Sequence, residues 1–194
     1  MGADSIPVLT ARFEDALAYA ASLHGGQVRK GTSIPYMSHL LAVCSLVLED
    51  GGDEDEAIAA LLHDAAEDQG GEATLSDIRE RFGDRVADIV GECSDTFEDP
   101  KPPWHQRKER YVAHLEEAPP SALRVSLADK LHNVRSILRD HREIGEKVWE
   151  RFNADRDEIL WYYRSVAEVF ARRSQSAMAE EFGRITSDLK RLVG

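Results

Sequence analysis

Apolar residues recur every three or four positions along nearly the whole chain, which is the spacing of one face of a helix. We find no convincing segment with the strict apolar and polar alternation of a half-buried strand. In the first helical stretch, Phe13, Ala16, Leu17 and Ala20 share a face, and Thr10 stands at the expected N-cap. The pattern predicts an all-α fold.

Glycine and proline residues divide this pattern into separate helices. Pro119-Pro120 separates two of them, Gly83 is expected to end a short helix that Thr74 caps, and the proline-rich segment 97–103 is expected to be a loop. The predicted helices span residues 10–24, 36–50, 53–68, 74–82, 84–95, 104–118, 121–140, 156–172 and 176–192.

The net charge of −12, from 36 acidic and 24 basic residues, limits the class of partner. Nucleic-acid polymers and anionic membranes would be repelled by such a charge. A small anionic substrate remains compatible, because a bound cation and a few local Arg and Lys residues can reverse the sign inside a cleft.

Targeting signals and disulfide patterns are also missing from the sequence. Cys44 and Cys93 are too few for a disulfide scaffold, and the start MGADSIPVLT has neither a basic region nor an apolar run. No apolar stretch approaches the roughly 20 residues that a membrane span needs. We therefore expect a cytoplasmic protein; the sequence does not predict its oligomeric state.

Four ionisable residues gather at the end of the apolar helix predicted over 53–68. His63 and Asp64 are adjacent, and Glu67 and Asp68 follow about one turn later. One reading is a hydrogen-bonded interior histidine beside solvated carboxylates. The other is a cation site, since burying unpaired carboxylates costs several kcal/mol unless a positive charge compensates.

Two further places carry polar residues on apolar helices. Asp129 and Asn133 are four residues apart and share a face. Asp129 could instead pair simply with Lys130 or Arg135. His39 precedes an apolar run and, taken alone, is a weak candidate for a metal ligand.

Taken together, three motifs resemble those of a known superfamily. They are HGGQVRK with PYMSH in residues 24–39, LHDAAED in 62–68 and LADKLHN in 127–133. In this order they resemble the HD phosphohydrolases and, more specifically, the (p)ppGpp hydrolase domain of RelA/SpoT-type enzymes and the stand-alone small alarmone hydrolases. The resemblance implies an HD-domain helical bundle with the metal site between helices. We expect one such domain over 1–194, with its motif-bearing core at about 10–140 and a helical extension at about 141–194.

The resemblance also implies a metal site and its ligands. By the matched motifs, His39, His63, Asp64 and Asp129 would bind the metal. A mixed set of imidazole and carboxylate ligands suits Mn²⁺, which the family resemblance also implies; another divalent transition metal is the alternative.

Residues around that metal receive roles in the same way. Glu67 and Asp68 match the acidic pair that orients or activates the attacking water. Arg29 and Lys30 match basic residues that contact the nucleotide, and Asn133 matches a residue near it. Without the motif, Arg29 and Lys30 would read as a solvated loop.

Some positions depart from the family pattern. Leu40 replaces a common Pro, Gln69 replaces a common Thr, Asp95 stands where Lys is common, and the loop before Pro35 is one residue longer. The loop and Asp95 lie where base recognition could change, so the sequence does not name the base.

The activity implied by the resemblance is hydrolysis of the 3′-pyrophosphate of an alarmone nucleotide, (p)ppGpp or (p)ppApp, with release of pyrophosphate. A hydrolase for another nucleotide or a phosphorylated cofactor is the first alternative. A metal-binding or ligand-sensing module without turnover is the second. The sequence contains no P-loop, HExxH motif or nucleophile elbow that would favour a different chemistry.

Overall fold

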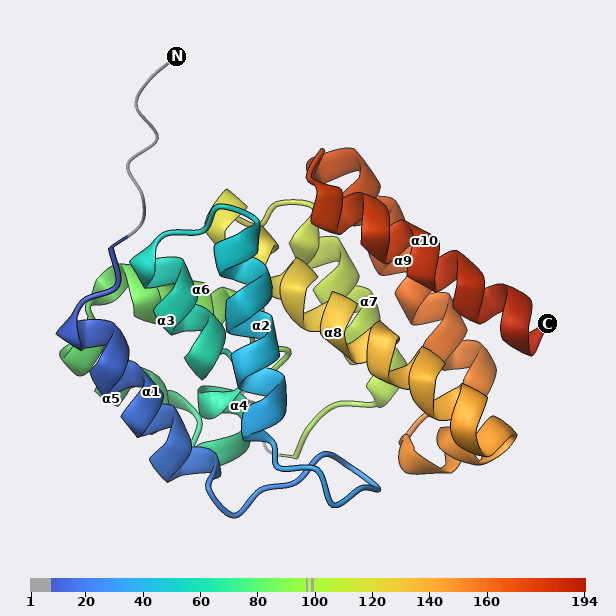
Figure 1. The fold of residues 1–194 in the computed structure, drawn as a ribbon, viewed down its shortest axis with the longest axis horizontal. Helices are drawn as coiled ribbons and strands as arrows, with labels where there is room; N and C mark the ends of the chain where they lie inside the picture. Colours follow the sequence, from blue (N-terminus) through green and yellow to red (C-terminus); the bar gives the residue numbers. More distant parts are fainter. Residues whose placement is uncertain (1–7, 97, 99) are drawn as a thin grey trace.

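The computed structural model describes residues 8–96, 98 and 100–194, and in this part of the chain it contains helices and no β-strand (Figure 1). The all-α prediction is confirmed, with one isolated antiparallel bridge between Val28 and Pro35. The elements are α1 (Ala11–His24), α2 (Met37–Glu49), α3 (Glu54–Leu62), α4 (Ala65–Gln69), α5 (Glu72–Phe82), α6 (Asp84–Cys93), α7 (Trp104–Leu115), α8 (Pro120–Ile144), the 3-10 helix η1 (Gly145–Arg151), α9 (Arg156–Arg173) and α10 (Ala177–Val193).

Local sequence explains where several helices begin and end. The Thr10 side chain accepts a hydrogen bond from the backbone N–H of Arg12 and caps α1, as predicted. Asp53 and Glu56 form a capping box at the start of α3. Gly83 ends α5 with φ of 93°, a conformation that a residue with a Cβ rarely adopts.

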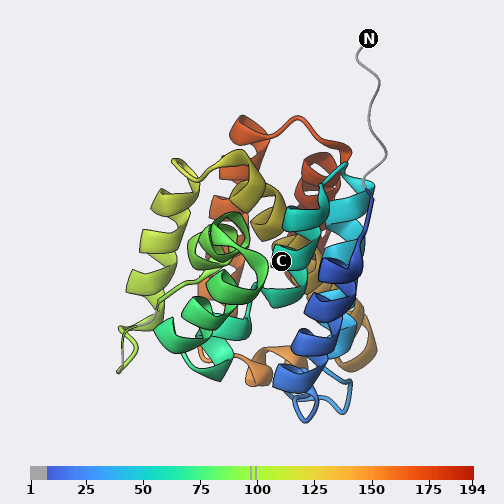
Figure 2. The ribbon, with the colours of Figure 1, turned by 90° about the vertical axis from the view of Figure 1, so that its left-hand side faces the viewer.

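Helix α8 runs through the middle of the bundle. It packs against α2, α3 and α6 on one side and against α9, α10 and η1 on the other (Figure 1). Viewed from the side of the early helices, α1, α5 and α6 cover that end of the molecule (Figure 2). This arrangement brings α2, the α3–α4 region and α8 together, and these are the segments that carry the polar motifs.

One buried hydrophobic cluster includes residues from every α-helix. It continues into the last two helices, where Phe170 and Phe182 are completely buried with ring centroids 5.5 Å apart. Burying one such side chain stabilises the fold by about 1.5–3 kcal/mol. Residues 141–194 therefore pack against the motif-bearing core through apolar side chains.

The prediction of one uninterrupted helix over 53–68 is wrong. Helix α3 ends at Leu62, and α4 begins only at Ala65. The Nδ1 atom of His63 donates to the carbonyl oxygen of Ala60 at 2.8 Å. In a regular helix that carbonyl would accept the backbone N–H of Asp64, so the imidazole competes with the helical ladder at the break.

Two smaller predictions also need correction. Thr74 does not cap α5, which begins at Glu72; it is buried inside the helix, and its hydroxyl donates to the carbonyl of Gln69. Helix η1 was not predicted, because a single 3-10 segment leaves no apolar period to detect.

Parts of two sequence-based expectations lie outside the described residues. These are residues 1–7, part of the segment used to judge targeting, and residues 97 and 99 of the predicted loop. Among the helices that the structure describes, none combines the length and apolar character needed to cross a bilayer.

Candidate metal centre

Three buried side chains from separate parts of the chain meet between the helices. They are His39 of α2, His63 of the α3–α4 break and Asp129 of α8, and one potential ligand atom from each lies within 4.8 Å of the others. Asp129 Oδ1 is 3.2 Å from His39 Nε2 and 3.7 Å from His63 Nε2.

Asp64 joins this group from the α3–α4 break. Its Oδ2 atom lies 3.0 Å from His63 Nε2 and 3.6 Å from His39 Nε2. The structure thus brings together the four residues that the motif resemblance implied as ligands. The break in the helix places His63 and Asp64 side by side at the cluster.

The donor set fits a divalent transition metal. The Nε2 atoms of His39 and His63 are buried and have no hydrogen-bond partner among the described residues. The carboxylate oxygens are near them, but the directions are not those of hydrogen bonds. Two unpartnered imidazole nitrogens facing two carboxylates form a set of ligands that such a metal prefers.

The remaining ring nitrogens are held by neighbouring groups. His63 Nδ1 donates to Ala60, and His39 Nδ1 lies 2.7 Å from His132 Nδ1. Burial, with the nearby His39 and Arg29, lowers the pKa of His132 to about 3, so His132 is neutral and can accept from His39. The bond to Ala60 places a proton on His63 Nδ1, and when His39 donates to His132 the Nε2 atoms of both rings are available to a metal.

The two carboxylates require a positive charge nearby. Burial lowers the pKa of His63, but Asp64 and Asp129 outweigh burial and raise it well above 6.5. Either a proton on His63 Nε2 or a metal ion bound to that atom would supply this positive charge. The two cannot occupy Nε2 at the same time.

Further side chains hold the carboxylates in place. Tyr36 donates its hydroxyl to Asp64 Oδ2 at 2.5 Å, and burial and Asp64 raise its pKa far above 10, so the hydroxyl stays protonated. Lys130 donates to Asp129 Oδ2 at 2.6 Å, and Asn133 donates to Oδ1. Burial raises the pKa of Asp129, but the opposing effect of Lys130 and the two histidines is larger. The pKa of Asp129 is therefore well below 3.8.

Glu67 and Asp68 follow the break on α4. Glu67 accepts from Lys101 Nζ at 2.8 Å and from the backbone N–H of Asp95 at 3.2 Å. Asp68 accepts from Gln27 at 2.8 Å. Burial and the charge of Asp64 raise the pKa of Asp68 above its usual value.

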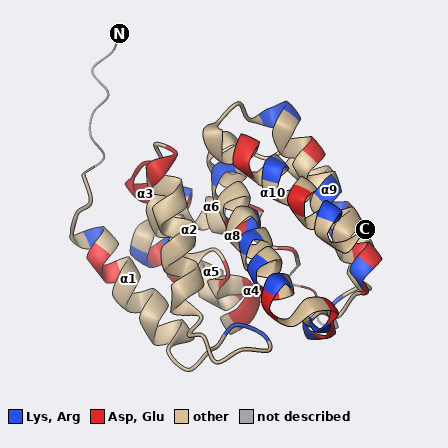
Figure 3. Cartoon of the chain, turned by 45° about the vertical axis from the view of Figure 1, so that its right-hand side comes forward, with Lys and Arg blue, Asp and Glu red and all other residues tan. Residues whose placement is uncertain are grey.

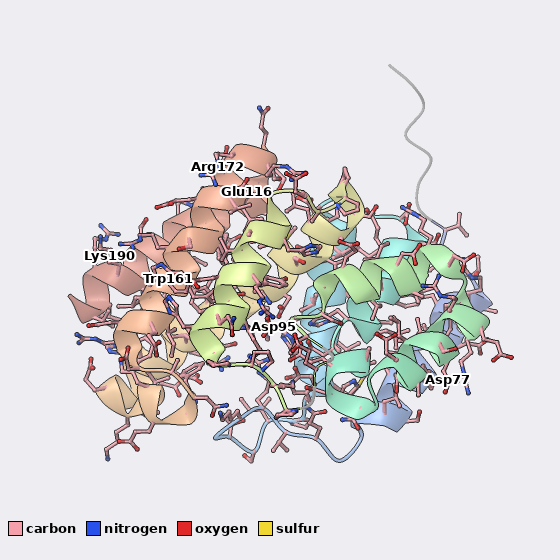
Figure 4. All side chains as sticks on the ribbon, turned by 180° about the vertical axis from the view of Figure 1, so that it is seen from behind. Asp77, Asp95, Glu116, Trp161, Arg172 and Lys190 are labelled. Atoms are coloured by element: carbon pink, nitrogen blue, oxygen red, sulfur yellow. The ribbon has the colours of Figure 1, made fainter. Side chains whose placement is uncertain are left out.

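Asp95 lies beside α7 (Figure 4), and its side chain is only 6% exposed. Its carboxylate pairs with Arg107 and with Lys108 of that helix, the latter at 2.9 Å. Burial and the charge of Lys130 lower the pKa of Lys108. A second buried charge group therefore lies beside Glu67.

The residues expected to contact a nucleotide divide into two groups. Arg29 donates to Asn133 Oδ1 at 2.7 Å, and its guanidinium carbon is 5.8 Å from the centre of the Tyr36 ring. Both Arg29 and Asn133 thus lie at the rim of the cluster. Lys30 extends away from it and donates to Asn153 at 2.6 Å.

Two cavities adjoin this rim. A cavity of about 100 Å³ is lined mainly by basic and polar side chains, among them Arg29, Lys30, His132, Arg139 and Arg151. A second, of about 240 Å³, includes Trp104, Lys108, Lys130, Asn133 and Tyr162. Lys and Arg residues lie along α8 and in the loop before α2 (Figure 3), so basic side chains are present at this rim although the whole chain has a net charge of −12. A larger groove between α9 and α10, about 550 Å³, contains none of the clustered residues.

Tyr36 and His132 have no predicted role, although both lie within the three sequence motifs. Their spacing from the expected ligands was visible, but their contacts cross from one helix to another. His24 stacks on Tyr36 with ring centroids 5.4 Å apart, and its Nδ1 atom lies 2.7 Å from Gln27 Oε1.

Comparison with known proteins places the site in context. Residues 16–160 match the model of the HD domain. The chain is 38% identical over 128 residues to the Xenopus tropicalis guanosine-3′,5′-bis(diphosphate) 3′-pyrophosphohydrolase MESH1, covering 64% of this chain and 69% of that protein. Its human counterpart is 34% identical over 142 residues, covering 72% and 74%.

Solved structures give the same picture. The structure of a metazoan ortholog of SpoT that hydrolyses ppGpp superposes with a TM-score of 0.77 at 25% identity, covering 96% of this chain and 99% of that one. A protein from Listeria monocytogenes superposes with a TM-score of 0.70 at 28% identity, covering 78% and 97%.

Proposed function

This chain belongs to the HD domain family, and we propose that it is a metal-dependent hydrolase of the 3′-pyrophosphate of an alarmone nucleotide, (p)ppGpp or (p)ppApp. The observation that carries the proposal is the meeting of three buried side chains, His39, His63 and Asp129, with the partly exposed Asp64. The names of the relatives support the substrate class.

In this proposal, the four clustered residues hold one divalent metal, and Mn²⁺ is our candidate. Such a metal, when bound, supplies Lewis-acid activation of the phosphoryl group and of water. The protein contributes the fixed ligand directions, through the hydrogen bonds of His39 and His63, and a buried site that excludes bulk water.

Glu67 and Asp68 are proposed as the groups that orient water and take its proton. Water attacks the phosphorus atom attached to the 3′ oxygen, and the bond between this phosphorus and the 3′ oxygen breaks. The water oxygen leaves on pyrophosphate, while the 3′ oxygen gains a proton and becomes a hydroxyl. The raised pKa of Asp68 favours proton transfer nearer neutral pH.

Arg29 and Asn133 are proposed to contact the nucleotide, since both lie at the rim of the cluster and each faces the other. A planar guanidinium can stack on a base and also donate hydrogen bonds. The basic cavity beside Arg29 would balance the phosphate charge. Lys30 is proposed to act at the outer edge of the same cavity.

A second candidate is hydrolysis of a different nucleotide or of a phosphorylated cofactor. The ion pairs of Asp95 with Arg107 and Lys108 favour this second candidate. Asp95 contacts Glu67 and stands where the enzymes that the chain resembles commonly have a lysine. A different charge there can change which base or phosphate is accepted.

A substrate screen with added Mn²⁺ tests these alternatives. The panel contains ppGpp, ppApp, ordinary nucleotides and nucleotide cofactors, with pyrophosphate and phosphate measured separately. We expect pyrophosphate from a 3′-pyrophosphorylated nucleotide. Turnover of another compound alone would support the second candidate. Metal binding without any hydrolysis would support a sensing module.

The proposed partner is thus a small nucleotide rather than a nucleic-acid polymer or a membrane, which agrees with the net charge of −12. We further propose a cytoplasmic location, since Cys44 and Cys93 are both free thiols and form no disulfide with each other. Fractionation of cells that produce the full chain would test the location.

A further inference from the structure

The loop between α1 and α2, residues 25–36, rests on the C-terminal extension. One point of contact is Gly31, where φ is 71°. A Cβ atom at Gly31 would lie 2.6 Å from Cγ and 2.8 Å from Cδ of Arg151. The aliphatic part of the Arg151 side chain therefore occupies the space that a side chain at position 31 would need.

Arg151 is itself fixed at its far end. Its Nη1 donates to Asp140 Oδ2 at 2.6 Å, and the two side chains retain 21% and 15% of their exposure. The side chain cannot leave Gly31 without breaking this partly buried pair. Lys30 adds a second, exposed contact by donating to Asn153.

Movement at Gly31 would be passed to Arg29 through the loop backbone. The N–H and hydroxyl of Thr32 both donate to the carbonyl of Arg29, at 3.0 and 2.8 Å. The N–H of Arg29 in turn donates to Ile34 at 2.8 Å. These bonds make residues 29–34 one compact turn.

We propose that Arg151 is a positioning residue: it holds the α1–α2 loop through Gly31, so that Arg29 meets Asn133 at the rim of the metal cluster. The C-terminal extension thereby contributes to substrate binding without touching the substrate. The catalytic consequence rests on the proposed function, whereas the docking of the loop does not.

Limited trypsin digestion tests the docking without any substrate, because trypsin cleaves after Arg29 and Lys30 when the loop opens. We expect Arg151→Ala to raise cleavage at these bonds severalfold, and Arg151→Lys, which keeps the aliphatic stem and the charge, to restore protection. The unfolding midpoint of each variant is measured alongside, so that faster cleavage caused by global loss of folding can be distinguished from opening of the loop. Unchanged cleavage in folded Arg151→Ala protein would overturn the proposal, whatever the substrate is.

Glycine substitution offers a matched pair. Gly51 also has a positive φ, 82°, but no atom would lie within 4 Å of a Cβ there. Gly31→Ala and Gly51→Ala therefore carry similar backbone strain and differ in the contact with Arg151. We expect only Gly31→Ala to raise KM for ppGpp, by roughly tenfold, with kcat and metal content near wild type.

The combined Gly31→Ala/Arg151→Ala variant completes the test. If both residues act through one contact, its KM should be no higher than that of the worse single variant. Additive effects, or a fall in kcat with unchanged KM, would reject positioning of substrate. If the wild type hydrolyses no alarmone while Arg151 still protects the loop from trypsin, the proposed function fails and the docking stands.

Discussion

Each imidazole of the metal cluster is fixed at one nitrogen and open at the other. His63 is fixed by a backbone carbonyl, and His39 by His132. Such contacts orient the ligands before a metal arrives, so the cost of ordering them is met by folding. The strength of the site therefore depends on residues that never touch the metal.

The ligand assignment predicts metal content. With Mn²⁺ supplied, the purified protein should retain about one ion per chain, as in single-metal sites with a mixed donor set. His63→Ala and Asp64→Ala should lower this to background in plasma mass spectrometry after dialysis. His105→Ala is the matched control, because the side chain of that histidine on α7 is 48% exposed and stacks on Trp161. Full metal retention by both ligand variants would refute the assignment.

Water activation predicts a different behaviour at Glu67. Glu67→Gln should keep the metal but lower kcat by about 10²–10⁴-fold, because an amide cannot take the proton. The control is Glu72→Gln, an exposed residue in the first turn of α5. Wild-type turnover in Glu67→Gln would remove Glu67 from the mechanism.

At the scale of elements, short-range signals predicted helix positions well and failed where side chains compete with the backbone. Thr10 could be predicted as a cap, because capping needs only a few neighbouring residues. The break at His63 could not, because it involves an imidazole bond that a periodic pattern does not encode. The contacts of Tyr36 and His132 were missed for a related reason, since they depend on how α2, α4 and α8 meet.

Helix α8 carries both the cluster and the core, which predicts unequal effects of leucine truncation. Leu131 is completely buried on α8, whereas Leu41 on α2 is 48% exposed. Leu131→Ala should lower the free energy of unfolding by about 2–5 kcal/mol, and Leu41→Ala by much less. Urea denaturation measures both, and equal losses would contradict this account of the core.

At the scale of the whole molecule, one hydrophobic cluster spans the motif-bearing core and the extension. The family match ends at residue 160, yet α9 and α10 bury large aromatic side chains against the same core. We therefore predict that residues 1–194 unfold as one unit, as the single-domain hypothesis requires. The expected metal ligands come from α2, the α3–α4 break and α8, so metal binding should report on that unit.

This coupling predicts metal-dependent stability. A ligand that binds only the folded state at 100 times its Kd adds about 2.7 kcal/mol. For a chain of this size, that raises Tm by about 5–10 °C. Addition of Mn²⁺ should therefore raise Tm in calorimetry, and EDTA should reverse the effect. His63→Ala should show no response; a response equal to wild type would place the stabilising metal elsewhere.

The interruption between Leu62 and Ala65 has a consequence for protein engineering. Methods that idealise backbones would join α3 and α4 into one regular helix, since regular geometry usually adds stability. Here the irregularity sets the direction of two side chains in the cluster. A redesigned chain could thus be more resistant to heat and yet have lost its chemistry, so its success should be judged by metal content before melting temperature.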